Sequence, residues 1–287
     1  MKLIRFGAPG RECPAVQLDD GTRLDVSEHI PDYTPEFFAN GGLARLRELI
    51  AAGRRLRPVP DGVRLGPPVA RPGKFVAVGL NYTSHCEEVG LPIPKEPEMF
   101  TKYTTCICGP DDPILIPRGS DRLDHELELA FVVGAKARYL ASPEEALRHI
   151  AGFMICNDVS ERSFQFDHGS QHVKGKSCDS FGPIGPWLAT TDEIADHRNL
   201  NMSLKVNGKV RQSGNTSDMI FDCPTILHNL SQFFTFEAGD IVTTGTPPGV
   251  GLGMKPPTFL KEGDVVELTF DKLGTQTQRV TALPRDY

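Results

Sequence analysis

A short run of alternating acidic residues constrains the fold of this chain more than any other feature of its sequence. Residues 124–130 are Asp-His-Glu-Leu-Glu-Leu-Ala, and the apolar residues Phe-Val-Val follow directly. Because successive side chains of a strand point to opposite faces, we expect Asp124, Glu126 and Glu128 on one face and the leucines on the core face. Adjacent carboxylates repel one another. The run therefore predicts either an exposed edge strand with solvated acids or a strand whose acids hold a cation.

A fourth acid favours the cation. Asp158 comes soon after the apolar residues 153–156, at the end of a predicted buried strand. A carboxylate in such a place is unfavourable unless it is paired or ligates a metal ion. Glu126, Glu128 and Asp158 are therefore the candidate metal ligands. An all-oxygen set suits a hard ion such as Mg²⁺, with Mn²⁺ or Ca²⁺ as alternatives.

A histidine and a glutamate three residues apart form a candidate catalytic pair. His85 and Glu88 follow the predicted strand 74–80. On a helical turn they would share a face and could form a hydrogen bond. An imidazole oriented by a carboxylate is a good general base for water. The alternative is a surface helix with an ordinary histidine and acid.

Two glycine-containing segments complete the set of candidate site motifs. Gly175-Lys176-Ser177 is similar to part of a phosphate loop, but Gly169 and Gly175 have five residues between them where that motif needs four. Lys176 can instead neutralise a developing oxyanion or enolate. Residues 244–251, Thr-Gly-Thr-Pro-Pro-Gly-Val-Gly, permit either close backbone approach to a ligand or simply a tight turn.

The residue patterns predict a β-rich α+β fold in two parts. Residues 1–28 have the pattern of short strands, and residues 42–52 that of an amphipathic helix. A proline-rich stretch predicts a boundary near residue 69, between a small N-terminal α/β domain (1–69) and a catalytic domain (70–287). In the larger part we expect strands at 74–80, 127–134, 151–157, 240–244, 264–270 and 278–283, a helix at 225–233, and a hairpin at Asn207-Gly208 with an extra residue after the turn.

Overall composition excludes several classes of protein. The net charge is -6 and the basic residues are dispersed, so we expect no nucleic-acid partner. No run of about 18 apolar residues is present, so we expect no membrane span. The seven cysteines are irregularly spaced and there is no signal-peptide pattern. These features predict reduced thiols and a cytoplasmic location.

Together, the four motifs resemble the fumarylacetoacetate hydrolase (FAH) superfamily over about residues 70–285. The resemblance implies the FAH-type mixed β-roll for the catalytic domain, usually paired as a homodimer. The motifs that carry it occur in family order and are Gly-Leu-Asn-Tyr-x-x-His-x-x-Glu at 79–88, Phe100-x-Lys102, the Glu-Leu-Glu strand, Asn157-Asp158-Val-Ser-x-Arg162, Gly175-Lys176-Ser177 and the segment 244–251.

The resemblance also implies roles for individual residues. It makes Glu126, Glu128 and Asp158 the metal ligands. It places His85 and Glu88 on a mobile lid as the pair that activates water, and makes Lys176 the active-site lysine. The implied substrate-binding residues are Tyr82, Arg162, Gln165 and Thr246.

Within the superfamily, the segments 181–187, 213–216 and 251–257 are similar to the subgroup that acts on 2,4-diketo-3-deoxy-sugar acids. This predicts a hydrolase that releases pyruvate and a small hydroxy acid from a 2-oxo acid derived from L-rhamnonate or L-fuconate. The same scaffold hosts fumarylpyruvate hydrolases, oxaloacetate decarboxylases and hydroxymuconate-type isomerases. His85 and Glu88 favour a hydrolase, because isomerases and decarboxylases can dispense with attacking water. A non-catalytic, metal-stabilised binding protein is the alternative from another class.

Overall fold

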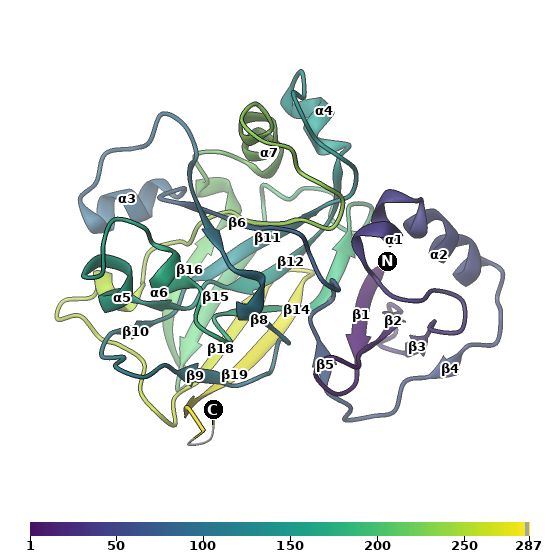
Figure 1. Ribbon diagram of the computed structural model, residues 1–287, viewed down its shortest axis with the longest axis horizontal. Coiled ribbons are helices and arrows are strands. Elements are labelled where there is room, and N and C mark those ends of the chain that lie inside the picture. The colour runs from purple at the N-terminus through teal and green to yellow at the C-terminus, as the bar shows by residue number, and fades with distance from the viewer. Residues whose placement is uncertain (285–286) are drawn as a thin grey trace.

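One large mixed sheet forms the framework of the protein. The computed structural model describes residues 1–284 and 287 (Figure 1). Short strands β5 (Leu65–Gly66) and β8 (Ile107–Cys108) join the sheet beside β1 and β14. Its main strands, in spatial order, are β4 (Arg57–Pro58), β3 (Arg23–Asp25), β2 (Cys13–Gln17), β1 (Lys2–Phe6), β14 (Gly182–Thr190), β12 (Ile150–Asn157), β11 (Leu127–Val133), β17 (Ile241–Thr243), β6 (Phe75–Gly79) and β7 (Glu98–Lys102).

A second sheet of five strands packs against the centre of the first. Its inward residues alternate along β15 and β18, as in Leu204 and Leu268, which are fully buried. A two-stranded pair, β10 (Leu123–Asp124) with β13 (Ser160–Glu161), lies beside the site described below. The five strands, in spatial order, are β16 (Lys209–Asn215), β15 (Asn201–Val206), β18 (Val265–Phe270), β19 (Gly274–Ala282) and β9 (Ile114–Ile116).

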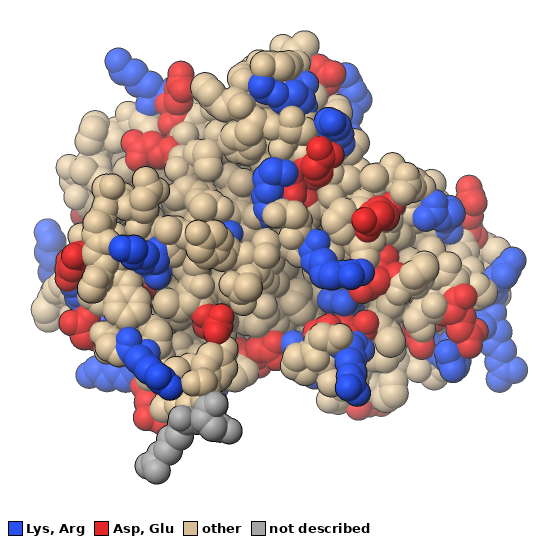
Figure 2. Space-filling view, in the orientation of Figure 1, with Lys and Arg blue, Asp and Glu red and all other residues tan. Residues whose placement is uncertain are grey.

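The helices are short and lie around the sheets. No described helix is long and apolar enough to cross a membrane. Figure 2 shows acidic and basic side chains interspersed over one face of the molecule. The helices are α1 (Pro35–Ala39), α2 (Gly42–Ala51), α3 (Thr83–Val89), α4 (Pro143–Leu147), α5 (Arg162–Phe166), α6 (Val173–Lys176) and α7 (Cys223–Ser231), with 3₁₀ turns η1 (Thr104–Cys106), η2 (Thr216–Asp218) and η3 (Gly251–Gly253).

The N-terminal strands and helices form a lobe that continues the main sheet (Figure 1). Strand β1 pairs with β14, with Leu3 opposite Leu188. Buried Phe37 and Leu46 of this lobe belong to the same hydrophobic core as Phe153 of β12. The domain boundary near residue 69 therefore stays a prediction, since hydrogen bonds and apolar packing both cross it.

The main predictions of secondary structure agree with the structure. The β-rich α+β class is confirmed, and the helix predicted at 42–52 is α2. The hairpin is confirmed: Val206 pairs with Lys209 across Asn207-Gly208, and both turn residues have positive φ. The extra residue does not directly follow the turn as predicted; it is Arg211, because Lys205 pairs with Val210 and Leu204 with Gln212. Helix α7 begins and ends two residues earlier than the predicted 225–233, because Asp222 caps it by accepting from the Thr225 N–H at 3.0 Å.

The acidic run departs from prediction in one respect. It is not one continuous strand, since residues 125 and 126 lie between β10 and β11. Nor is it an exposed edge, because β11 lies between β12 and β17 and all seven of its residues are buried. The solvated-edge alternative is therefore wrong.

A buried glutamine connects the two sheets where the main sheet is irregular. The β12–β14 register shifts between Phe153 and Ile155, and Pro186 in the facing stretch has no N–H to donate. Gln276 of β19 donates from Nε2 to the carbonyl oxygens of Ile155 at 3.1 Å and Gly185 at 2.9 Å. Its side chain is fully buried. Gln276 therefore links two buried carbonyl groups of the main sheet to the second sheet through side-chain hydrogen bonds.

Replacing this glutamine should destabilise the whole protein. Gln276→Met keeps the size of the side chain but removes the donor of two buried hydrogen bonds, which should lower the free energy of unfolding by about 1–3 kcal/mol. Urea denaturation would measure the loss. The control is Thr277→Ala, because that neighbouring side chain is exposed. Equal stability of the two variants would contradict this role for Gln276.

Candidate metal centre and catalytic pair

Two antiparallel strands bring the three predicted metal ligands together. Glu128 lies in β11 opposite Cys156 of β12, and Asp158 directly follows the end of β12. Glu126 directly precedes β11, and its carbonyl accepts from the Asp158 N–H at 2.9 Å. One carboxylate oxygen from each of Glu126, Glu128 and Asp158 lies within 4.8 Å of the others, and all three residues are buried.

Two lysines compensate part of this buried negative charge. Lys176 Nζ lies 2.6 Å from Glu126 Oε2 and 2.8 Å from Asp158 Oδ2. Lys102 Nζ lies 2.5 Å from Asp158 Oδ1 and also donates to the Lys176 carbonyl. Both lysines are almost completely buried. Their ammonium groups therefore act as fixed counter-charges inside the protein.

An arginine connects the cluster to Asp124. Arg162 Nη2 lies 2.8 Å from Asp124 Oδ2 and 2.7 Å from Glu126 Oε1. The four carboxylates of Asp124, Glu126, Glu128 and Asp158 thus face the three cations of Lys102, Lys176 and Arg162. With every group ionised, one negative charge remains. A bound divalent cation would reverse the sign and leave one positive charge for an anionic substrate.

The carboxylates differ in how far their charge is compensated. Burial opposes ionisation of Glu126, but Lys176 and Arg162 outweigh it and lower its pKa to about 2. Burial raises the pKa of Glu128 well above its ordinary value, and the charges of Asp158 and Glu126 add to this effect. Among the described residues Glu128 has no ion pair with a lysine or arginine, although the Gly245 N–H donates to its Oε2 at 2.9 Å. This donor set fits a hard divalent cation, which prefers carboxylate oxygens.

The predicted catalytic pair lies on helix α3. His85 Nδ1 is 2.9 Å from Glu88 Oε2, so the hydrogen bond expected from their spacing is present. Because the carboxylate can only accept, Nδ1 carries the proton and Nε2 keeps its lone pair in the neutral ring. The second oxygen of Glu88, Oε1, accepts from the Gly249 N–H at 2.8 Å. Glu88 therefore binds the His85 ring through one carboxylate oxygen and the backbone at Gly249 through the other.

A small cavity joins the histidine to the acidic cluster. Its volume of about 150 Å³ is below the range of about 300–1,000 Å³ that drug-sized ligands occupy, and it suits a small molecule. Half-buried His172 faces it, and burial and the charge of Lys176 lower the pKa of this imidazole. The cavity is lined by Val78, Gly79, Leu80, His85, Leu91, Phe100, Glu126, Glu128, Arg162, Gln165, His172, Lys176, Gly245 and Thr246.

The predicted substrate-binding residues differ in their surroundings. Arg162 is already paired with two carboxylates, and its Nη1 donates to Gln165 Oε1 at 3.0 Å. Thr246 donates its hydroxyl proton to the Leu127 carbonyl at 2.9 Å. Tyr82 is fully buried, its hydroxyl lies 3.9 Å from Met202 Sδ, and it does not line the cavity. The structure thus brings Arg162, Gln165 and Thr246 to the cavity, but not Tyr82.

Sequence reasoning assigned no role to three residues that the structure places here. Lys102 ends β7, a strand whose other residues are more exposed, and nothing in its local pattern indicates a buried ion pair. His172 directly precedes α6, and Phe100 lies edge-on to its ring. These contacts depend on long-range packing, and the one sequence signal was the motif Phe100-x-Lys102, which contains two of these residues without indicating their partners.

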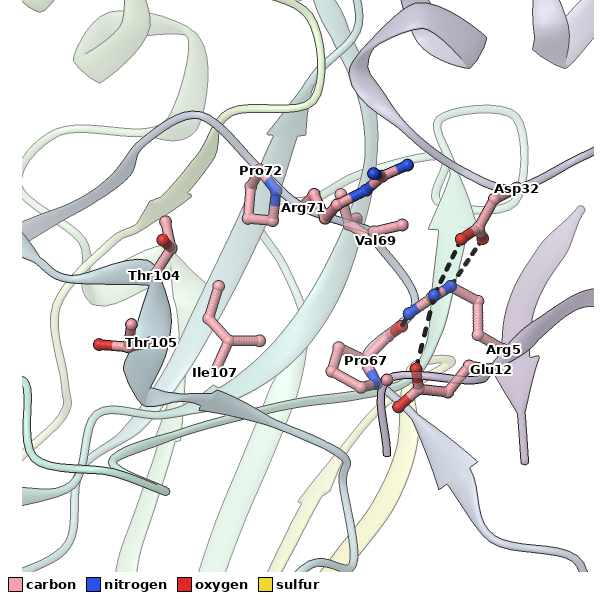
Figure 3. Close-up of a pocket in the computed structure, with 12 residues that line it drawn as sticks. Arg5, Glu12, Asp32, Pro67, Val69, Arg71, Pro72, Thr104, Thr105 and Ile107 are labelled. Atoms are coloured by element: carbon pink, nitrogen blue, oxygen red, sulfur yellow. Dashed lines mark hydrogen bonds and ion pairs between the residues drawn. The ribbon is translucent and has the colours of Figure 1, made fainter. Parts of the chain in front are cut away.

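A larger cavity lies elsewhere in the described part of the chain. It has a volume of about 580 Å³ and lies between the N-terminal lobe and the segment 104–107 (Figure 3). Arg5 in its wall is already paired with Asp32, with Nε 2.7 Å from Oδ1, and lies 3.6 Å from Glu12. Among the described residues, the only group of three potential metal ligands is that of Glu126, Glu128 and Asp158. The smaller cavity is therefore the candidate active site.

Known proteins share this architecture along almost the whole chain. The fumarylacetoacetate (FAA) hydrolase C-terminal family model matches residues 74–281. A Burkholderia multivorans relative, provisionally named only as a hydrolase, is 47% identical over 283 residues, which are 98% of this chain and 99% of the relative.

Two solved structures extend the comparison. Maleylpyruvate hydrolase from a Sphingobium species, in complex with manganese(II) ion and pyruvate, is 28% identical with a TM-score of 0.81, over 99% of this chain and 100% of that one. A 5-carboxymethyl-2-hydroxymuconate delta-isomerase from Mycobacterium smegmatis is 32% identical with a TM-score of 0.78, at the same coverage. The chain therefore belongs to the fumarylacetoacetate hydrolase family of hydrolases and isomerases.

Proposed function

We propose that this protein is a divalent-metal-dependent hydrolase that cleaves a carbon–carbon bond in a short 2,4-dioxo acid. The observation that carries the proposal is that His85, oriented by Glu88, lines the same small cavity as Glu126 and Glu128. The pyruvate and manganese in the solved maleylpyruvate hydrolase support this choice. One dioxo acid and one water would give pyruvate and one carboxylic acid.

The proposed metal site consists of Glu126, Glu128 and Asp158, with Mg²⁺ as the expected ion and Mn²⁺ as an alternative. A cation held there would polarise the 2-oxo group as a Lewis acid and orient the substrate carboxylate. The protein contributes the fixed positions of these acids. It also contributes the lysines that make a cluster of buried carboxylates tolerable.

His85 is the proposed general base. Its Nε2 takes a proton from water, whose oxygen adds to carbon 4 of the substrate, the carbonyl carbon farther from the carboxylate. When the tetrahedral adduct collapses, the bond between carbons 3 and 4 breaks, and its electron pair forms the enolate of pyruvate. The protonated His85 can return the proton to carbon 3. Lys176 lines the cavity, so its ammonium can offset the developing negative charge.

Within this class we propose a 2,4-diketo-3-deoxy-sugar acid, such as that derived from L-rhamnonate or L-fuconate, as the substrate. The cavity volume of about 150 Å³ suits such a short chain. The polar side chains of Gln165 and His172 in its wall suit a hydroxylated end. The second candidate is an acylpyruvate such as fumarylpyruvate or maleylpyruvate, which the maleylpyruvate hydrolase favours. Both follow the same reaction.

Product analysis tests the reaction. Incubation of 2,4-diketo acids with the protein, Mg²⁺ or Mn²⁺ and ¹⁸O-labelled water should release pyruvate, which lactate dehydrogenase detects. The label should enter the carboxylate of the other product, because water adds to carbon 4. Isomerised substrate without pyruvate would contradict the proposal and favour the activity of the isomerase relative.

Removal of the base should stop turnover and leave the fold intact. His85→Ala should lower kcat by about 10²–10⁴-fold, the usual contribution of a general base. The shift in melting temperature on adding Mn²⁺ should stay as in the wild type, because His85 is not in the ligand cluster. His168→Ala, at an exposed histidine outside the cavity, is the matched control. Wild-type turnover in His85→Ala would remove this residue from the mechanism.

Glu128 should make stability depend on pH in the absence of metal. Since burial raises its pKa above the ordinary 4.5, the folded state favours its protonated form. This stabilisation is complete below about pH 4.5 and is lost as pH rises through the raised pKa. As pH rises above about 4.5, metal-free Glu128→Gln should therefore lose less stability than the metal-free wild type.

Thermal unfolding in EDTA would measure the pH dependence without metal, and unfolding in Mn²⁺ would measure the stabilisation by the bound ion. Mn²⁺ should stabilise the wild type and leave Glu128→Gln nearly unchanged, because the variant lacks one ligand charge. Glu144→Gln, at an exposed glutamate, should behave as the wild type. A full Mn²⁺ response in Glu128→Gln would exclude Glu128 from the ligand set.

A further inference from the structure

Glu88 makes a second contact that orientation of His85 alone does not require. Its Oε2 holds His85 Nδ1 at 2.9 Å, while Oε1 accepts from the Gly249 N–H at 2.8 Å. A carboxylate bound at both oxygens cannot rotate without losing one partner. The position of Gly249 therefore decides where Glu88, and with it the imidazole, is held.

The turn that contains Gly249 is itself fixed by the residues that precede the metal cluster. Asp124 accepts from the Gly251 N–H at 2.7 Å through Oδ1 and from the Leu252 N–H at 3.0 Å through Oδ2. His125 Nε2 lies 3.3 Å from the Gly249 carbonyl, so this nitrogen carries the proton and donates. Both side chains are buried. Glu126 follows them directly. The segment Asp124–Glu126 therefore contacts the turn through its first two residues and contributes its third residue to the acidic cluster.

We propose that the turn Gly249–Gly253 is the positioning element of the general base, through which the segment Asp124–Glu126 sets the orientation of Glu88 and His85. This inference rests on the proposed function and names residues that act through the catalytic pair. Helix α3 meets the turn through the hydrogen bond between Glu88 and Gly249, so the orientation of the base depends on that contact. The contact thereby fixes the position of His85 Nε2 relative to the acidic cluster.

Glu88 packs so closely against Gly253 that the turn has no room for a side chain at this position. A Cβ atom added there would lie 2.6 Å from Glu88 Cδ and 2.7 Å from its Oε1. Its backbone φ is not in the left-handed region, so alanine can adopt the conformation of the turn. The group displaced by Gly253→Ala is thus the carboxylate end of the flexible Glu88 side chain. The substitution should move Glu88 away from the Gly249 N–H and leave the fold intact.

The test compares Gly253→Ala with the wild type and with a control, Lys255→Ala. Lys255 is exposed and lies two residues beyond the turn. We expect kcat for the 2,4-diketo acid to fall about 100-fold, as for a catalytic group displaced by about 1 Å, with KM unchanged. Affinity for Mn²⁺ and the melting temperature should match the wild type. Amide hydrogen exchange of residue 249 and of α3 should become about tenfold faster, as expected from the loss of one hydrogen bond. Lys255→Ala should change none of these quantities.

Each outcome separates the positioning role from the proposed function. A wild-type kcat in Gly253→Ala, or unchanged exchange at residue 249, would overturn the positioning role. Loss of Mn²⁺ affinity or a large fall in melting temperature would overturn it as well, because the effect would then be global. If the wild type turns over no dioxo acid, the proposed function fails, and faster exchange in Gly253→Ala alone would still support the positioning of Glu88.

Discussion

Compensation of buried carboxylate charge is the constraint on which the rest of this structure depends. Glu126, Glu128 and Asp158 lie within 4.8 Å of one another and are buried, so their mutual repulsion is only weakly screened by water. Lys102, Lys176 and Arg162 compensate most of it. With Asp124 counted, one negative charge remains, and Glu128 is the acid without a lysine or arginine ion pair among the described residues; burial raises its pKa. A divalent cation at this place would reverse the sign of the net charge and offset the repulsion between the acids.

Each charged residue of the cluster lies on, or directly beside, a strand or helix of the fold. The acids come from the central pair β11 and β12, which are buried on both faces of the main sheet. The cations come from its edge strand β7 and from the short helices α5 and α6. The catalytic pair lies on α3, which the glycine turn Gly249–Gly253 meets. These separate parts of the chain thus meet around a cavity of about 150 Å³.

Local patterns predicted the elements better than the site. The β-rich class, the helix 42–52 and the hairpin at Asn207-Gly208 follow from periodicity and turn chemistry, and they agree with the structure. The hydrogen bond between His85 and Glu88 follows from their spacing on one helical turn. Long-range contacts did not follow: Lys102 at the cluster, and Tyr82 outside the cavity, depend on how distant strands pack. The acidic run was expected as one strand, and its interruption at His125 reflects the burial of that ring against the glycine turn.

The most direct test of the central claim is the position of a bound cation. Crystals grown with Mn²⁺ and pyruvate, measured with anomalous scattering, should show one strong peak in contact with carboxylate oxygens of Glu126, Glu128 and Asp158, beside His85. No peak at this cluster under saturating Mn²⁺, or one held by other residues, would contradict the account.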